Sequence, residues 1–104
     1  MKTEKVHITK WSNGKDIRSL LCSLQTVLWQ NANWQPLMMS TLNTLVEVKK
    51  AYRHACVAVH PDKNNGTENE EIAKLIFIEL NNAWTDFEKN PTALDEFGLV
   101  RNWC

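Results

Sequence analysis

The sequence predicts an all-α fold, because apolar side chains recur at helical spacing in three separate segments of the chain. Two further observations support this fold class. Threonine–glutamate capping boxes precede the second and third of these segments, and prolines follow both of them. The 104 residues, of which 43% are hydrophobic, suffice for one domain with a single modest core.

Three parts of the chain are distinguished by this pattern. Residues 1–15 are expected to be an N-terminal lead-in, and residues 16–89 the folded domain. Residues 90–104 form a C-terminal tail that could hold one short helix. No part is repeated or of low complexity, which indicates a single folded unit.

The first helix is expected over residues 16–29. Its apolar stripe consists of Ile17, Leu20, Leu21, Leu24 and Leu28. Residues 30–44 contain Pro36 and keep no sustained period, so they are expected to be a connection that wraps back over the core. Trp34 and Leu37 are the side chains that could hold it there.

A second helix is expected over residues 45–59. Thr44 and Glu47 form a capping box at its start, in which hydroxyl and carboxylate satisfy backbone amides reciprocally. One side of this helix is apolar and the other is basic. The apolar side carries Val48, Ala51, Tyr52, Ala55 and Val59, and the basic side carries Lys49, Lys50, Arg53 and His54.

A loop over residues 60–66 separates the second helix from the third. Pro61 pushes His60 out of helical geometry, so the second helix should end there. Because the loop is short, the two helices are expected to pack as an antiparallel hairpin that carries the loop at its tip. The first helix would then cross the apolar face that the two share.

The third helix is expected over residues 68–89. Thr67 and Glu70 form a capping box before it, and Pro91 follows its end. Its apolar stripe consists of Ala73, Ile76, Phe77, Leu80, Ala83, Trp84 and Phe87. This stripe runs for four turns, which favours a helix buried along one side.

Composition excludes several classes of function. Twelve basic residues balance twelve acidic ones, so no net field draws the chain to nucleic acid or to an anionic membrane. No apolar run is long enough for membrane insertion. Cys22, Cys56 and Cys104 are widely spaced, which predicts reduced thiols in a cytoplasmic protein.

His60-Pro61-Asp62, between a basic amphipathic helix and an aromatic-striped one, resembles the J domain of DnaJ-type co-chaperones. Tyr52-Arg53, Lys63 and the pattern Phe77-x-x-Leu80-Asn81-x-Ala83-Trp84 strengthen the resemblance. The resemblance implies a J-domain fold. It also implies a partner, the nucleotide-binding domain of the cytosolic seventy-kilodalton heat-shock chaperone, whose ATP hydrolysis the module would stimulate.

The residues of this loop can also be interpreted physically. Pro61 restricts the backbone, so His60 and Asp62 would be presented with little entropy left to lose on binding. The Asp62 carboxylate can cap its own turn or accept a bidentate bond from a partner arginine. The resemblance implies the second role.

The basic face, defined here as Lys49, Lys50 and Arg53, has two interpretations. It could steer an acidic partner surface, or it could simply be a solvated helix face. The resemblance favours the first, with Lys63 as a further contact.

The segment before the hairpin narrows the resemblance to one group of J domains. Residues 11–21, Val27-Leu28-Trp29 and Trp34-Gln35-Pro36-Leu37 are similar to auxilin and the cyclin-G-associated kinase. That resemblance implies a role in clathrin-coat disassembly at coated vesicles. Coats would be reached through regions outside this chain, and a kinase domain could lie upstream.

Other functions remain as alternatives. A degenerate J-like scaffold would bind a protein partner without stimulating its ATPase. An enzyme built on Cys56 and His60 would need a thiol of low pKa. A metal site from His7, His54, His60 and the cysteines has no supporting spacing. We therefore expect a monomer without cofactor, metal or catalytic residues.

Overall fold

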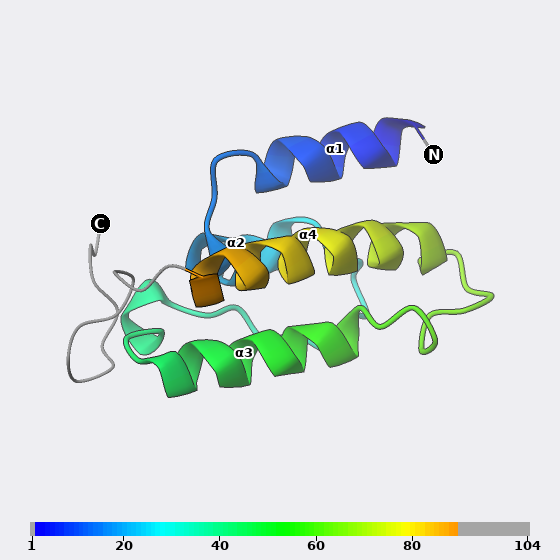
Figure 1. Ribbon diagram of the computed structural model, residues 1–104. Coiled ribbons are helices and arrows are strands. Elements are labelled where there is room, and N and C mark those ends of the chain that lie inside the picture. Colours follow the sequence, from blue (N-terminus) through cyan, green and yellow to red (C-terminus); the bar gives the residue numbers. More distant parts are fainter. Residues whose placement is uncertain (1, 90–104) are drawn as a thin grey trace.

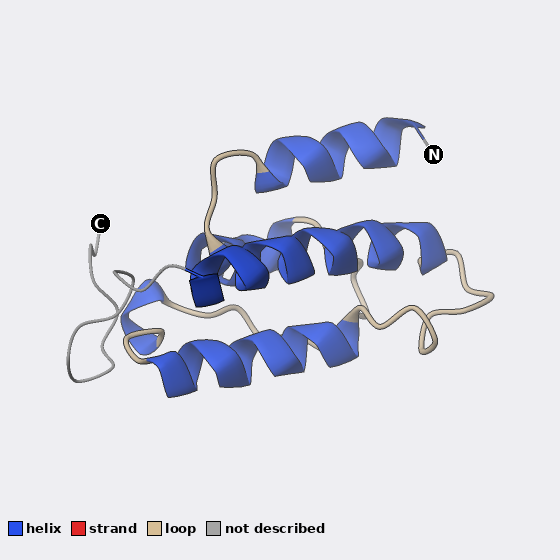
Figure 2. Cartoon of the chain, viewed as in Figure 1, coloured by secondary structure: helices blue, strands red, loops and turns tan. Residues whose placement is uncertain are grey.

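The computed structural model describes residues 2–89, and the expected tail over residues 90–104 lies outside this range. The described part consists of helices and loops and has no β-strand (Figure 2). It confirms the predicted all-α class. The elements are α1 (Lys2–Ser12), α2 (Ile17–Ser23), η1 (Leu24–Thr26), η2 (Met39–Thr41), α3 (Leu45–Ala58) and α4 (Glu70–Lys89).

Helices α3 and α4 lie side by side and antiparallel, and the loop between them projects from one end of the pair (Figure 1). The start of α3 is capped by Thr44, whose Oγ1 accepts a hydrogen bond from the Glu47 N–H at 3.1 Å. The helix ends at Ala58, one residue before the expected end. Val59 has left helical geometry, in keeping with the proline two residues later.

The start of α4 differs from the expected one. The helix begins at Glu70, not at residue 68, and the Thr67–Glu70 capping box does not form as expected. The Thr67 hydroxyl instead accepts from the Asn69 N–H at 3.2 Å, and the Glu70 carboxylate accepts from the Gly66 N–H at 2.8 Å. The Glu70 side chain therefore bonds to the loop before α4 and does not cap the first turn of the helix.

The helix expected over residues 16–29 is shorter than predicted. Asp16 caps α2 by accepting from the Ser19 N–H at 2.9 Å, but the α-helix ends at Ser23 and tightens into η1. The Ser23 hydroxyl donates to the Ser19 carbonyl at 2.8 Å, and Thr26 donates to the Ser23 carbonyl at 2.6 Å. Such side-chain bonds to the backbone compete with regular helix geometry, which explains the early end.

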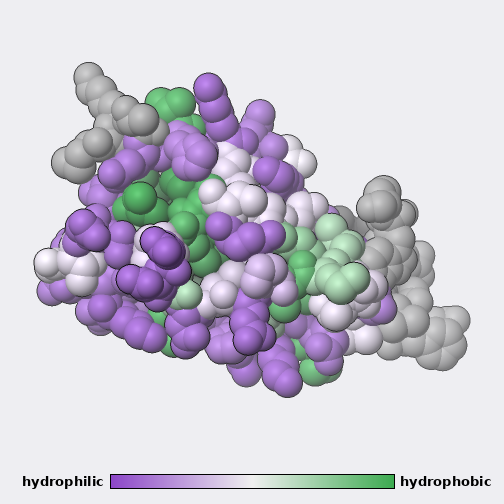
Figure 3. Space-filling model, turned by 180° about the vertical axis from the view of Figure 1, so that it is seen from behind, coloured by the Kyte–Doolittle hydropathy of each residue, from purple (hydrophilic) through white to green (hydrophobic). Residues whose placement is uncertain are grey.

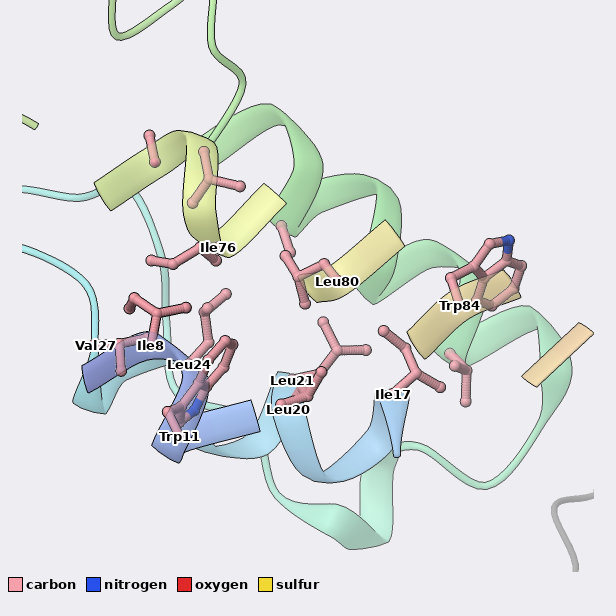
Figure 4. Packing of buried hydrophobic residues seen from close by; sticks show 14 of the residues in the cluster. Ile8, Trp11, Ile17, Leu20, Leu21, Leu24, Val27, Ile76, Leu80 and Trp84 are labelled. Atoms are coloured by element: carbon pink, nitrogen blue, oxygen red, sulfur yellow. The ribbon is translucent and has the colours of Figure 1, made fainter. Parts of the chain in front are cut away.

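The core lies where α2 and η1 pack against the hairpin. Ile17 lies near Trp84, while Leu21 points toward Leu80 of α4 (Figure 4). The fully buried large side chains are Ile17, Leu20, Leu21, Leu24, Leu42, Val48, Val59, Ile76 and Leu80. Nearly all of them belong to the stripes predicted for the three helices.

Residues 1–15, expected to be a lead-in, contain a helix. α1 lies along α4, on the side away from α3 (Figure 1). Its Ile8 and Trp11 are buried in the core, and the Trp11 Nε1–H donates to the Ser23 Oγ at 2.9 Å. These two apolar residues are too few for a recognisable stripe, so packing rather than local pattern stabilises this helix.

The connection over residues 30–44 packs against the core as expected, and it contains the short helix η2. Arg18 holds it. This side chain is 4% exposed, and its guanidinium donates to the carbonyls of Leu42 at 2.8 Å and Met39 at 3.2 Å. Trp34 and Leu37 are half-buried against the core.

The surface mixes hydrophilic and apolar side chains. Seen from behind, apolar residues emerge between polar ones without forming one continuous face (Figure 3). The exposed large hydrophobic residues are Val6, Met38, Leu45, Val46, Val57 and Ile78. They come from four different parts of the chain, so no single element presents a wide apolar surface.

Candidate functional site

The loop over residues 60–66 holds His60-Pro61-Asp62 at the tip of the hairpin. The His60 and Asp62 side chains are exposed, and Pro61 is half-buried. The His60 ring meets the ring of Phe77 from α4 edge to face, with centroids 5.7 Å apart. The first turn after α3 is thus supported from the neighbouring helix.

Hydrogen bonds within the loop restrict the conformation of His60 and Asp62. The Asp62 N–H donates to the His60 Nδ1 at 3.2 Å, so the imidazole acts as a hydrogen-bond acceptor within the loop. The His60 carbonyl accepts from the N–H of Lys63 at 3.1 Å and of Asn64 at 3.2 Å. Main chain and imidazole together therefore form the turn.

Asn64 is a structural residue of the loop that the sequence analysis missed. It is 8% exposed, and its Nδ2 donates to the His60 carbonyl at 2.9 Å and to the Ala58 carbonyl at 3.4 Å. Its own carbonyl accepts from the Thr67 hydroxyl at 2.7 Å. The sequence contains the pair Asn64-Asn65, and both residues are ordinary turn formers. Nothing local tells which one is buried.

The far end of the loop turns at Gly66. Its φ of +80° lies in the left-handed region, where a residue with a Cβ is strained. The Glu70 carboxylate accepts from its N–H, as described above. This bond joins the loop to the first turn of α4.

The Asp62 carboxylate does not take part in this network. Within residues 2–89, no hydrogen bond or ion pair reaches it. Of the two roles that the sequence left open, capping its own turn is therefore not the one seen. Imidazole and amide groups make the turn, so the carboxylate remains available to an external donor.

The basic face lies on α3, the helix that leads into the loop. Lys49, Lys50 and Arg53 are all exposed, as is Lys63 on the loop itself. No ion pair within residues 2–89 involves any of them. His54 is exposed too, and its ring meets the Trp34 ring at an angle of 64° with centroids 6.3 Å apart.

Cys56 and Tyr52 lie on the same helix, and their environment is unsuited to a nucleophile. Burial raises the pKa of the Cys56 thiol, although its hydrogen bond with Tyr52 opposes the rise. A reactive cysteine needs the opposite shift.

Tyr52 stacks on Trp84 with centroids 4.8 Å apart, and its hydroxyl donates to the Asn81 Oδ1 at 3.3 Å. Burial, with a contribution from Cys56, raises the pKa of Tyr52 to about 12.

The described residues offer neither a metal site nor a membrane-spanning helix. Across residues 2–89, no three His, Cys, Asp or Glu side chains are grouped so that they could hold a metal ion. None of the helices in this range combines the length and the apolar character needed to cross a membrane.

Comparison with known proteins identifies relatives of this sequence. A family model described as the DnaJ domain matches residues 34–93. Auxilin-related protein 1 of Arabidopsis thaliana is 40% identical over 91 residues, covering 82% of this chain and 10% of that protein. An auxilin-like clathrin uncoating factor of Saccharomyces cerevisiae is 39% identical over 87 residues, covering 78% of this chain and 13% of that protein.

A third relative carries a name from a different process. The J domain-containing protein required for chloroplast accumulation response 1, from Arabidopsis thaliana, is 36% identical over 93 residues, covering 84% of this chain and 14% of that protein. The chain thus spans 10 to 14% of the length of these three relatives.

Proposed function

The chain belongs to the DnaJ-domain family, whose members act as co-chaperones, and on that premise we propose that it stimulates ATP hydrolysis by a cytosolic seventy-kilodalton heat-shock chaperone. One observation carries the proposal. Among residues 2–89 the exposed Asp62 carboxylate has no partner, and it lies on a loop whose conformation is already restricted by His60 and Asn64.

The chemistry would belong to the partner. Asp62 would accept a bidentate bond from an arginine of the chaperone's nucleotide-binding domain, with His60 and Pro61 completing the contact. Because the loop is ordered before binding, little conformational entropy is lost when the complex forms. The chain would then favour the hydrolysing state of the chaperone by binding it more tightly than the resting state.

The basic face would act earlier, during association. Lys49, Lys50 and Arg53 share one arc of α3, the helix that leads into the loop, and Lys63 lies on the loop. Exposed cations mainly raise the association rate, and salt screens them over about 8 to 10 Å near physiological ionic strength. Salt should therefore slow association more than it speeds dissociation.

Single-turnover ATP hydrolysis by the purified chaperone tests the proposal. The wild-type chain should accelerate hydrolysis, while Asp62→Asn and His60→Gln should each weaken productive binding about thirtyfold, as for loss of an interface hot spot. Lys74→Glu, an exposed α4 position outside the basic face, is the matched control. A flat ATPase response with intact binding would instead support the degenerate scaffold.

We further propose that the full-length protein acts in the cytoplasm in the disassembly of clathrin coats. The support is the similarity to a yeast protein named as a clathrin uncoating factor. Contacts to the coat would be made by regions outside this chain. Release of clathrin from purified coats, by a longer protein with chaperone and ATP, tests it. Failure to release clathrin despite normal ATPase stimulation would refute this role alone.

A further inference from the structure

A groove of about 490 Å³ lies between the connection over residues 30–44 and helix α3. We call it the strap groove. Trp34, Leu37, Leu42 and Ala51 give it an apolar lining, Lys50 contributes a cation, and His54 contributes an imidazole. Its size and its mixture of apolar surface with a few polar groups are typical of ligand sites. It lies apart from the loop at the hairpin tip.

One side of the strap groove is formed by the connection, which carries unused backbone donors. Within residues 2–89, no backbone hydrogen bond is made by the N–H of Gln35 or of Leu37. Met38, the residue after Leu37, is extended, with φ −97° and ψ 144°, and Pro36 favours extended geometry at Gln35 before it. In an extended chain alternate N–H groups point to the same side, so we infer that Gln35 and Leu37 form one edge. Pro36, between them, would not interrupt it.

The Trp34 side chain adds a third unpaired donor within the described residues. Its Nε1 is buried and has no hydrogen-bond partner within the described residues. Buried N–H groups in folded proteins nearly always have a partner, because desolvation without a hydrogen bond is costly. The ring belongs to the lining of the groove, so an acceptor bound there could satisfy the indole after a small shift.

The charges of the groove select the chemistry of an occupant. Lys50 and His54 lie one turn apart on α3 and both line the groove, and Arg53 is exposed beside them. Glu47 lines it one turn earlier. An occupant with a carboxylate near Lys50 and Arg53, on the side of the groove away from Glu47, complements this arrangement. An uncharged apolar ligand would leave these two cations unmatched.

We propose that the strap groove binds an extended acidic peptide segment of a partner protein. The peptide backbone pairs with the edge formed by Gln35 and Leu37, in the manner of strand addition. Its apolar side chains contact Trp34 and Leu37, and a carboxylate meets Lys50. This site is separate from the one proposed for ATPase stimulation, and only Lys50 belongs to both.

Binding can be measured without any chaperone. The probe is the peptide fluorescein-Ser-Leu-Asp-Leu-Asp-Leu-Ser-amide, labelled at its N-terminus, whose alternation places its carboxylates on one side when extended. Fluorescence polarisation with the 104-residue chain should give saturable binding. The same peptide with Asn in place of Asp should bind about tenfold more weakly, as for loss of a charge-assisted hydrogen bond.

Variants of the chain identify the site. Lys50→Glu should weaken peptide binding by about tenfold or more. Trp34→Phe should weaken it by about fivefold, because phenylalanine keeps an aromatic ring but loses the N–H donor of the indole. The exposed control Lys74→Glu and the loop variant Asp62→Asn should bind like wild type. Trp34→Phe should also stimulate the chaperone normally, which separates this site from the proposed function.

The amide resonances provide an independent measurement. Titration of the isotope-labelled chain with the peptide should shift the signals of Gln35 and Leu37 most. Absence of saturable binding, equal binding of the Asn peptide, or shifts confined to residues 60–66 would each overturn the proposal.

Discussion

The hairpin and the N-terminal half of this molecule are both helical, yet they are specified in different ways. In the hairpin, local signals coincide with the structure: Thr44 caps α3, a proline follows its end, and a four-turn stripe forms the buried side of α4. In the N-terminal half, long-range bonds from Trp11 to Ser23 and from Arg18 to Leu42 hold the elements in place.

The two proposed binding sites depend on these two regions in different ways. The exposed groups proposed to bind the chaperone lie on the hairpin, whose elements are defined by their own sequence. The strap groove requires both halves, because one side comes from the connection and the other from α3. A change in the N-terminal half should therefore affect the groove and overall stability before it affects the loop.

The largest expected effect comes from breaking the contact between the halves. Leu21 is fully buried and points toward Leu80 of α4 (Figure 4). Leu21→Ala should lower the free energy of unfolding by about 2–5 kcal/mol, from lost burial and the cavity left behind. Urea denaturation measures this value. A loss below about 1 kcal/mol would show that the halves are less coupled than the packing indicates.

Asn64 tests whether the loop depends on its own buried side chain. Asn64→Ala removes the donor to His60 and Ala58, and should lower the free energy of unfolding by about 1–3 kcal/mol. Asn64→Ala should also weaken ATPase stimulation, because this side chain holds the His60 carbonyl in the loop. That loss should persist at temperatures where the variant is fully folded. The exposed neighbour provides the control, since Asn65→Ala should change both quantities little. Equal effects of Asn64→Ala and Asn65→Ala would show that the buried Asn64 side chain does not hold the loop in its conformation.

A smaller effect is expected at the start of the hairpin. Thr44→Ala removes the cap of α3 and should lower the free energy of unfolding by about 1 kcal/mol. Thr44→Ser keeps the hydroxyl and should retain most of the stability. Thermal unfolding followed by circular dichroism compares the two. If serine and alanine destabilised equally, the hydroxyl bond would not be the stabilising feature.

The smallest effect concerns alkaline pH. The pKa of Tyr52 is raised to about 12, so folding favours its protonated form. Its contribution to stability should be fully present below the unfolded value of about 10, and lost as pH rises toward 12. Because Tyr52 is the chain's single tyrosine, the absorbance of tyrosinate follows it directly. A folded-state midpoint at about 10, equal to that of unfolded tyrosine, would contradict the shift.

Cys56 extends this comparison to reactivity. Burial raises its pKa, so little thiolate forms near neutral pH and alkylation should be slow in the folded chain. Denaturant should accelerate the reaction by exposing the thiol. Rapid alkylation of Cys56 in the folded chain at neutral pH, distinguished from that of Cys22 and Cys104 by mass spectrometry of peptides, would revive the hypothesis of a nucleophilic cysteine.

The all-α class, the three apolar stripes and the family to which the chain belongs could all be predicted from the sequence. These depend on spacings within a few residues, where apolar period, caps and prolines act locally. Thr44 is the clearest case, since its hydroxyl bonds an amide only three residues away.

Three other features became visible only in the tertiary structure. It showed that residues 2–12 form a helix, that Asn64 is the buried asparagine, and that a groove with an unpaired indole lies under the connection. Each of these depends on groups that are distant in sequence or equivalent in local chemistry. Short-range pattern holds no information about which of two adjacent asparagines will meet the end of a helix. Burial is a property of the packed chain, and it decides between them.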